Sequence, residues 1–372
     1  MNSDVIVIGA GAIGSSIGYQ LAKAGVKVII LERGQVGREA TGASAGMVAA
    51  SHDRNTPQPF AALATESARL FPALAEELKD RTGMDIGYRR AGRLQVAFDE
   101  LAEQRLRAER GWQVDHGAIV PWLDRASVLD LEPALNPAVR AAVYYAEEYQ
   151  LLPLMLAQAL ARAAADLGAA VREGAAIDRL LTEGDRVAGV AIGDERIHAD
   201  QVVIANGSWA GGWATPLEVP IPIRPIRGQL VALRTPGTAL RTVISAQDAY
   251  VVTKPDGLTI IGTTVEDVGF DSRPTAAGIG GLLNLAPRLA PRLGDATFSG
   301  AWAGLRPGTP DGMPLIGRLP PWRGVVLASG HFRNGILLAP VTGELVTDLI
   351  LRRQPRLAIE AFDPGRFLVR AA

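Results

Sequence analysis

The sequence predicts an α/β fold in which a largely parallel sheet is interrupted by an inserted layer of antiparallel strands. A β-branched run at 5–8 leads into a glycine-rich turn and an amphipathic segment, the pattern of a buried strand followed by a helix. Residues 218–265 instead alternate apolar side chains between frequent Pro and Gly turns, which is typical of antiparallel strands. An apolar run at 324–328, followed by a helical segment at 336–351, returns to the first pattern.

The first sheet is expected to start with a strand–helix–strand unit. After the strand at 5–8, a helix is predicted over 12–24, because apolar side chains recur every four residues and Gly25 supplies a stop signal. A second buried strand at 27–31 ends in Glu32. This is the length of a βαβ unit with parallel strands.

The later elements are expected to alternate between the two layers. Helices are predicted at 59–82 and 151–168, strands of the first sheet at 170–172 and 202–207, and strand-like stretches of the inserted layer at 87–98 and 218–265.

Composition and charge exclude several classes of protein. The 372 residues hold 38 Lys and Arg against 39 Asp and Glu, so no excess positive charge is left for a nucleic-acid partner. A hydrophobic content of 48% excludes a disordered chain. The absence of Cys excludes disulfides and thiolate metal sites, and the four His show no metal-ligand spacing. Glycines break the first apolar stretch, so we expect no signal peptide, no membrane span and a cytoplasmic location.

The strongest local signal is the run of glycines after the first strand. Gly9 permits the tight turn, Gly11 lets the backbone approach a pyrophosphate, and Gly14 lets helix and strand pack closely. The helix N-terminus then offers N–H groups to phosphate. Glu32, 18 residues after Gly14, is placed to accept hydrogen bonds from ribose hydroxyls. It disfavours a 2′-phosphate, although the neighbouring Arg33 leaves that alternative open. We therefore predict a Rossmann-like dinucleotide-binding domain.

The glycine motif does not distinguish NAD from FAD, but three later segments favour FAD. The loop at 42–46 either wraps pyrophosphate and flavin or is an ordinary flexible loop. A late strand at 202–207 returns to the first sheet. The segment 329–336 is predicted to lead into a helix, whose N-terminus could lie under the flavin pyrimidine ring and stabilise the charge that builds there on reduction.

Four stretches resemble the D-amino-acid-oxidase-type flavoproteins, and among these the bacterial glycine oxidases of thiamine biosynthesis. They are 302–312, 330–340, Ala45-Gly46-Met47 and the strand at Tyr250, and the similarity runs from Val5 to about Leu351. The resemblance implies a Rossmann-like FAD-binding domain with an inserted antiparallel-sheet α+β substrate domain. It also implies non-covalent FAD, O2 as acceptor, and oxidative deamination of small amines (glycine, sarcosine, D-alanine, D-proline) to an imine or 2-oxo acid with release of H2O2. The oligomer that it suggests is a homotetramer.

Domain boundaries and cofactor contacts complete this prediction. The FAD-binding domain is expected to comprise 1–86, 151–215 and 310–372, and the substrate-binding domain 87–150 and 216–309. The expected cofactor-binding residues are Gly9, Gly11, Ile13, Gly14, Glu32, Arg33, Thr41, Ala45, Gly46, Met47, Ile177, Gly207, His331, Arg333, Asn334, Gly335, Ile336 and Leu337.

Three residues are carried over by the resemblance to the substrate site. Arg306 matches the arginine that holds the substrate carboxylate, Tyr250 a tyrosine lining the same pocket, and Arg333 a further arginine. The residues themselves leave alternatives. Arg306 lies in an apolar Gly/Pro-rich segment and needs an anionic partner, which is either a small carboxylate or an acid such as Asp311. Tyr250 could simply pack in the core, and Arg333 could neutralise cofactor charge.

Two positions depart from the family pattern. Val265 stands where a methionine is found near the pocket, and Asp248 where a histidine is found, so we expect both to affect substrate preference more than reaction type. The alternatives are a D-amino-acid dehydrogenase that passes electrons to a quinone, or a sarcosine-oxidase-like enzyme with another substrate or acceptor. A non-catalytic flavin-binding subunit and an NAD-dependent dehydrogenase are weaker alternatives.

Overall fold

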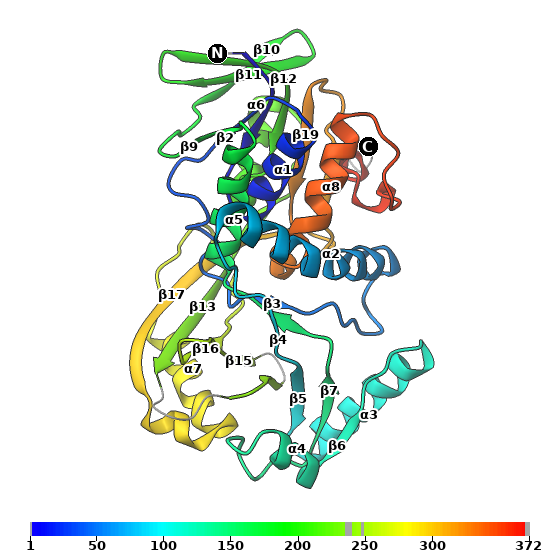
Figure 1. The fold of residues 1–372 in the computed structure, drawn as a ribbon, viewed down its shortest axis with the longest axis vertical. Coiled ribbons are helices and arrows are strands. Elements are labelled where there is room, and N and C mark those ends of the chain that lie inside the picture. Colours follow the sequence, from blue (N-terminus) through cyan, green and yellow to red (C-terminus); the bar gives the residue numbers. More distant parts are fainter. Residues whose placement is uncertain (1, 235–239, 247–248, 369–372) are drawn as a thin grey trace.

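Two large sheets, one above the other in Figure 1, make up the fold, and they confirm the α/β class predicted from the sequence. The computed structural model describes residues 2–234, 240–246 and 249–368. Strands of the first sheet come from 2–31, 170–204 and 315–329, and those of the second from 93–145 and 224–308. The chain therefore alternates between the sheets, while the domain boundaries given above stay a prediction.

The first sheet is built around parallel strands. β1 lies between β12 and β2, β9 follows β2, and β19 pairs with the other edge of β12, all in parallel. β10, β11 and β18 add antiparallel edges. The bounds are β1 (Asn2–Ile8), β2 (Val28–Leu31), β9 (Ala170–Arg172), β10 (Arg179–Glu183), β11 (Arg186–Ile192), β12 (Glu195–Ile204), β18 (Leu315–Arg318) and β19 (Val325–Ser329). The predicted strand at 202–207 is thus the end of β12, which stops before the turn at Asn206.

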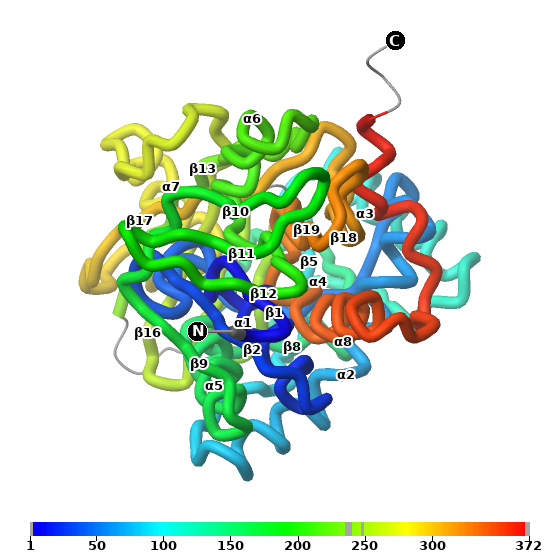
Figure 2. The backbone as a smooth tube through the Cα atoms, turned by 90° about the horizontal axis from the view of Figure 1, so that it is seen from above, coloured from blue at the N-terminus to red at the C-terminus, as the bar shows by residue number. Residues whose placement is uncertain are grey.

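Helices cover one face of this sheet. They are α1 (Ala12–Lys23), α2 (Gln58–Thr82), α5 (Pro153–Asp166) and α8 (Ala339–Ile350). α1 contacts α5 and α8, α2 packs on the same two helices, and in Figure 2 α2, α5 and α8 lie together on one side. The core between them and the sheet includes Val5, Ile17, Leu160 and Leu345, all fully buried. Within the described ranges, no helix combines the length and apolarity needed to cross a membrane.

The C-terminal helix starts later than predicted. The segment expected to be helical from 336 begins with the 3-10 helix η3 (Phe332–Asn334) and a turn, and α8 starts only at Ala339. Pro340 explains the difference, because proline has no N–H and fits the first turn of a helix but not its interior. A 3-10 turn therefore stands where an α-helix N-terminus was expected.

The second sheet is antiparallel except for one pair. Its order is β17-β13-β16-β15-β14-β5-β7-β6, and among the described strand pairs only β14 and β5 run parallel. The bounds are β5 (Arg93–Ala97), β6 (Trp122–Asp124), β7 (Ala141–Tyr145), β13 (Arg224–Arg234), β14 (Val243–Ala246), β15 (Ala249–Thr253), β16 (Leu258–Gly262) and β17 (Thr297–Gly308). Helices α3 (Glu100–Asp115), α4 (Arg125–Leu131) and α7 (Ala276–Leu289) pack on it, and a small sheet of β3 (Met47–Val48), β8 (Tyr149–Gln150) and β4 (Arg89–Arg90) adjoins.

The long strand β17 ties the second sheet to the first. The Trp302 Nε1 donates a hydrogen bond to the Ala43 carbonyl at 3.0 Å, and the Ser208 hydroxyl donates to the Leu305 carbonyl at 2.8 Å. Ala43 lies in the loop after β2, and Ser208 lies in the 3-10 helix η1 (Gly207–Trp213) that follows β12. β17 is thus held at the carboxyl ends of the parallel strands, where ligands bind in open α/β sheets.

Candidate active site

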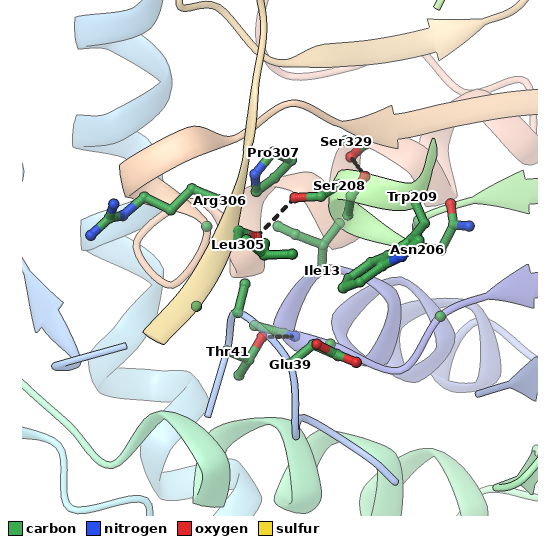
Figure 3. Close-up of a pocket in the computed structure, with 18 of the residues that line it drawn as sticks. Ile13, Glu39, Thr41, Asn206, Ser208, Trp209, Leu305, Arg306, Pro307 and Ser329 are labelled. Atoms are coloured by element: carbon green, nitrogen blue, oxygen red, sulfur yellow. Dashed lines mark hydrogen bonds between the residues drawn. The ribbon is translucent and has the colours of Figure 1, made fainter. Parts of the chain in front are cut away.

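A cavity of about 630 Å³ lies where the carboxyl ends of β1, β2 and β12 meet β13 and β17. This volume is within the range of small-molecule and cofactor sites. In Figure 3 Arg306 extends from β17 away from Asn206 and Trp209, so these residues mark two different ends of the cavity. We call them the substrate end (Tyr250, Thr263, Arg306, Arg333) and the nucleotide end (Glu32, Arg33, Asn206, Trp209, Trp213).

The glycine turn forms part of the cavity wall. Gly9 has a φ of +100°, and a Cβ there would lie 2.9 Å from the Ala205 carbonyl oxygen. Gly11 is the N-cap of α1 and provides no side-chain cap, so the first turn of the helix is presented to the cavity. Gly14 lies behind the wall, where a Cβ would be 1.9 Å from the Gly9 carbonyl oxygen. Because Gly9 and Gly11 carry no side chain, the turn leaves room for a pyrophosphate, and the Ala12 N–H of the first helical turn donates to the Thr41 hydroxyl at 3.0 Å.

The acidic residue at the end of β2 is buried in the cavity wall. One Glu32 carboxylate oxygen accepts the Ala10 N–H and the other accepts the Gly34 N–H, both at 2.9 Å. Each carboxylate oxygen has a further lone pair, so ribose hydroxyls can still donate to this group.

Arg33 is engaged by its neighbours at the nucleotide end. Its guanidinium lies 3.7 Å from the centroid of the Trp209 ring and forms an ion pair with Glu39 at 2.5 Å. Because Glu39 already balances the charge of Arg33, the structure offers no support for a 2′-phosphate site here.

Two buried polar atoms of the nucleotide end lack a hydrogen-bond partner among the described residues. They are the Asn206 Oδ1 and the Trp213 Nε1, and both residues line the cavity. Leaving such atoms unpaired is costly, and one acceptor with one donor suits the hydroxyl and base groups of a bound dinucleotide. The residues present therefore fit FAD.

The substrate end contains a guanidinium without a carboxylate partner. Arg306 donates to the Thr264 carbonyl at 3.3 Å and to the Thr263 hydroxyl at 2.6 Å, and it forms no ion pair within the part of the chain that the structure describes. Asp311, the acid considered above, pairs instead with Arg366 at 2.8 Å. Burial and the charge of Arg333 lower the pKa of Arg306. The structural ion pair is therefore excluded for Asp311.

Glu266 is also engaged elsewhere. It lies on the loop that carries Thr264, but its carboxylate pairs with the buried Arg227 at 2.5 Å and accepts from Gln229 at 2.7 Å. The backbone N–H of Gln229 donates a second hydrogen bond, to the Thr264 hydroxyl at 2.9 Å. This network fixes the loop against β13 and leaves the charge of Arg306 directed to the cavity.

Tyr250 and Arg333 complete the substrate end. Burial raises the pKa of the Tyr250 phenol, and the charges of Arg306 and Arg333 partly oppose that rise. The phenol stays protonated near neutral pH and can donate a hydrogen bond. Arg333 is exposed and lies in η3, after Phe332, whose φ is +47°.

The turn after β19 contributes a neutral histidine. His331 is fully buried, burial lowers its pKa to about 3, and its Nε2 lies 3.1 Å from the Thr342 hydroxyl. Gly335 and Ile336 line the cavity, whereas Asn334 and Leu337 do not. The Leu337 carbonyl accepts the Ser67 hydroxyl at 2.6 Å, which places this residue in the core.

The structure brings most of the predicted site residues to the cavity. The residues that line it are Gly9, Gly11, Ile13, Glu32, Arg33, Thr41, Ala45, Gly46, Met47, Ile177, Gly207, Tyr250, Arg306, His331, Arg333, Gly335 and Ile336. Gly14, Asn334 and Leu337 lie outside the lining, and so does Val265, which is 50% exposed. Asp248 lies outside the described residues. No cluster of His, Asp or Glu suited to a metal ion is found in the described ranges.

Sequence reasoning missed several lining residues. Asn206, Ser208, Trp209 and Trp213 follow the end of β12, and their position after a strand of the parallel sheet was a usable signal. Gly228 and Thr263 also line the substrate end. No local pattern marks them, because they reach the cavity through the pairing of distant strands.

Comparisons with known proteins agree with this geometry. A family model described as FAD dependent oxidoreductase (DAO) matches residues 4–349. A glycine oxidase from Geobacillus kaustophilus is 37% identical over 368 residues, which cover 98% of this chain and 97% of that protein. The bifunctional protein ThiO/ThiG from Synechocystis sp. is 36% identical over 373 residues, covering 98% of this chain and 54% of that protein. The crystal structure of the Geobacillus kaustophilus glycine oxidase matches with a TM-score of 0.92 at 36% identity, over 97% of this chain and 98% of that one.

Proposed function

This chain belongs to the DAO family of FAD-dependent oxidoreductases, and on that premise we propose that it oxidises glycine and other small amines with O2. Membership confirms the predicted family, the predicted cofactor FAD and the predicted enzyme class, an FAD-dependent amine oxidase. The sequence has no Cys, so no cysteinyl link to the cofactor exists. The substrates are proposed as glycine, sarcosine, D-alanine and D-proline.

The observation that carries this proposal is the state of Arg306. Its guanidinium lines the cavity, is partly buried, and forms no ion pair in the described chain. An uncompensated charge in a low-dielectric site is costly, so the site favours an anionic ligand. A carboxylate matches the planar fork of arginine with two parallel hydrogen bonds. The small relatives of glycine carry that carboxylate next to the amine that reacts.

The residues of the substrate end then have distinct roles. Arg306 holds the carboxylate, Thr263 and the Thr264 carbonyl hold the guanidinium, and the protonated Tyr250 hydroxyl donates to the bound acid. The anchored carboxylate fixes the direction of the substrate Cα–H bond. No protein base at Cα is required once the amine is neutral. When bound, FAD supplies the two-electron oxidant, and O2 regenerates it with release of H2O2. The balanced reaction is glycine + O2 + H2O → glyoxylate + NH4+ + H2O2.

An amine panel tests the proposal. Purified holoenzyme is mixed with glycine, sarcosine, D-alanine, D-proline or L-alanine in air, H2O2 is measured, and the absorption spectrum is recorded with and without O2. We expect peroxide and anaerobic bleaching with the first four amines. Bleaching with little peroxide would favour a dehydrogenase, and a flavin that no amine bleaches would favour a non-catalytic subunit.

Three further expectations belong to this proposal. They are a role in thiamine biosynthesis, a cytoplasmic location and a homotetrameric assembly. Similarity to the bifunctional protein ThiO/ThiG from Synechocystis sp. over 98% of this chain supports the first of them.

A further inference from the structure

We infer that Gly228 and Gly262 determine the depth of the amine pocket, because the two proposed substrate-binding side chains lie directly on them. A Cβ built on Gly228 would lie 2.1 Å from Nη2, 2.2 Å from Nη1 and 2.3 Å from Cζ of Arg306. A Cβ built on Gly262 would lie 2.7 Å from both the Cζ and the hydroxyl oxygen of Tyr250. The inference rests on the proposed function, since it concerns the same site.

Strand pairing explains why these residues meet. On β13 and β17 Gly228 is opposite Gly304, two residues from Arg306, and on β16 and β15 Gly262 is opposite Tyr250. Gly262 is also opposite Leu230, which is two residues from Gly228. Side chains two residues apart share a face of a sheet, so both glycines form one floor under both side chains.

A left-handed backbone is not the reason for glycine at either position. Neither Gly228 nor Gly262 has a positive φ. A Cβ is excluded because the side chains of Arg306 and Tyr250 occupy the space above the two glycines. The glycines allow the guanidinium and the phenol to lie flat against the sheet, which leaves the volume above them to the substrate.

A Cβ at Gly228 would move the substrate anchor. Ordinary contacts begin near 3.4 Å, so the guanidinium must rise and lose its hydrogen bond to the Thr263 hydroxyl. A misplacement of about 1 Å can cost about 100-fold in rate. The raised anchor also shortens the pocket, so amines with an extra methyl group lose more than glycine does.

The test compares alanine variants with a matched control. Gly228→Ala and Gly262→Ala are set against Gly280→Ala on α7, where a Cβ meets nothing within 4 Å. For each holoenzyme, kcat/KM is measured for glycine, sarcosine and D-alanine. The dissociation constant of glycolate, a carboxylate without the amine, is read from the flavin spectrum. We expect weaker glycolate binding and a lower kcat/KM for Gly228→Ala, with D-alanine and sarcosine affected more than glycine, and no change for Gly280→Ala.

A double-mutant cycle shows whether Gly228 acts through Arg306. Gly228→Ala should have no further effect on glycolate binding in an Arg306→Ala background. Equal effects in both backgrounds, or a Gly228→Ala variant that matches Gly280→Ala, overturn the inference. If Gly228→Ala does not retain FAD, the inference is tested on Gly262→Ala by its glycolate dissociation constant and its kcat/KM values. Wild-type enzyme that neither binds glycolate nor oxidises glycine contradicts the proposed function instead.

Discussion

The two ends of the cavity are built in different ways. At the nucleotide end, the glycine turn and Glu32 come from one continuous stretch of chain, and the Glu32 carboxylate accepts the N–H groups of Ala10 and Gly34 within that stretch. The substrate end is assembled from Gly228, Tyr250, Thr263 and Arg306 on four separate segments, and its main charge has no acidic partner in the described chain. The first is fixed by local backbone geometry, and the second by strand register. Damage to one end should therefore leave the other intact.

Removal of the substrate anchor is expected to have the largest effect. Arg306→Ala should raise KM for glycine at least about 30-fold, since truncating a partner of a buried charge pair costs about 2–5 kcal/mol. Steady-state peroxide assays measure the change, and FAD content should stay at the wild-type level. Arg105→Ala, at an exposed position on α3, serves as control. An unchanged KM would remove Arg306 from the site.

The corresponding change at the nucleotide end should act on the cofactor. In Gly14→Ala the new Cβ would lie 1.9 Å from a backbone oxygen of Gly9, which no side-chain motion can relieve. Such overpacking costs about 1–3 kcal/mol, so FAD per chain and the thermal midpoint should both fall. Gly111→Ala on α3, where a Cβ meets nothing within 4 Å, is the matched control. Equal FAD content in the two variants would contradict the packing role of Gly14.

A buried lysine that contacts the loop carrying Ala45 should give a pH-dependent stability. The Lys254 ammonium donates to the carbonyls of Ala45 and Leu151 at 2.5 and 2.9 Å and to the Gln150 side chain at 3.2 Å. Burial, with a smaller effect of the Arg89 charge, lowers the pKa of Lys254 to about 7. In the unfolded chain, Lys254 keeps its proton up to about pH 10. Between about pH 7 and pH 10 the unfolded state therefore binds more protons than the folded state. The free energy of unfolding then rises with pH, by up to about 1.4 kcal/mol per pH unit.

Denaturant unfolding of the holoenzyme at pH 7, 8 and 9 measures this slope of the free energy of unfolding against pH. Lys254→Met should remove it, because the titrating group is then absent. The exposed Lys79 on α2 provides the control, and Lys79→Met should keep the wild-type slope. Identical slopes in all three proteins would show that Lys254 does not titrate in this range.

The smallest effect is expected at the outer wall of the nucleotide end. Arg33→Ala removes the cation that lies 3.7 Å from the centroid of the Trp209 ring. An exposed cation–π contact contributes about 0.5–1 kcal/mol, so the FAD dissociation constant should rise about two- to fivefold. KM for glycine should not change. A larger effect on KM than on FAD binding would show that the two ends are coupled.

The comparison also explains what could be predicted from the sequence. The strand–helix–strand unit, its glycines and Glu32 follow from local pattern, and the helix over 12–24 differs from α1 by one residue. The helical pattern from 336 predicts too early a start for α8, because Pro340 fits only the first turn of a helix. Gly228 and Thr263 could not be predicted, because only the pairing of β13, β16 and β17 brings them beside Arg306. The register between strands that are distant in the chain cannot be predicted from a short stretch of sequence.

One strand, β17, carries adjacent residues that serve the two ends of the cavity. Leu305 and Arg306 are adjacent on β17, and Figure 3 shows their side chains on opposite sides of it. The Leu305 carbonyl accepts a hydrogen bond from the Ser208 hydroxyl beside the nucleotide end, while the Arg306 side chain lines the substrate end. Consecutive Cα atoms are about 3.8 Å apart by covalent geometry. A displacement of β17 would therefore move Arg306 and strain the hydrogen bond between Leu305 and Ser208 at the same time.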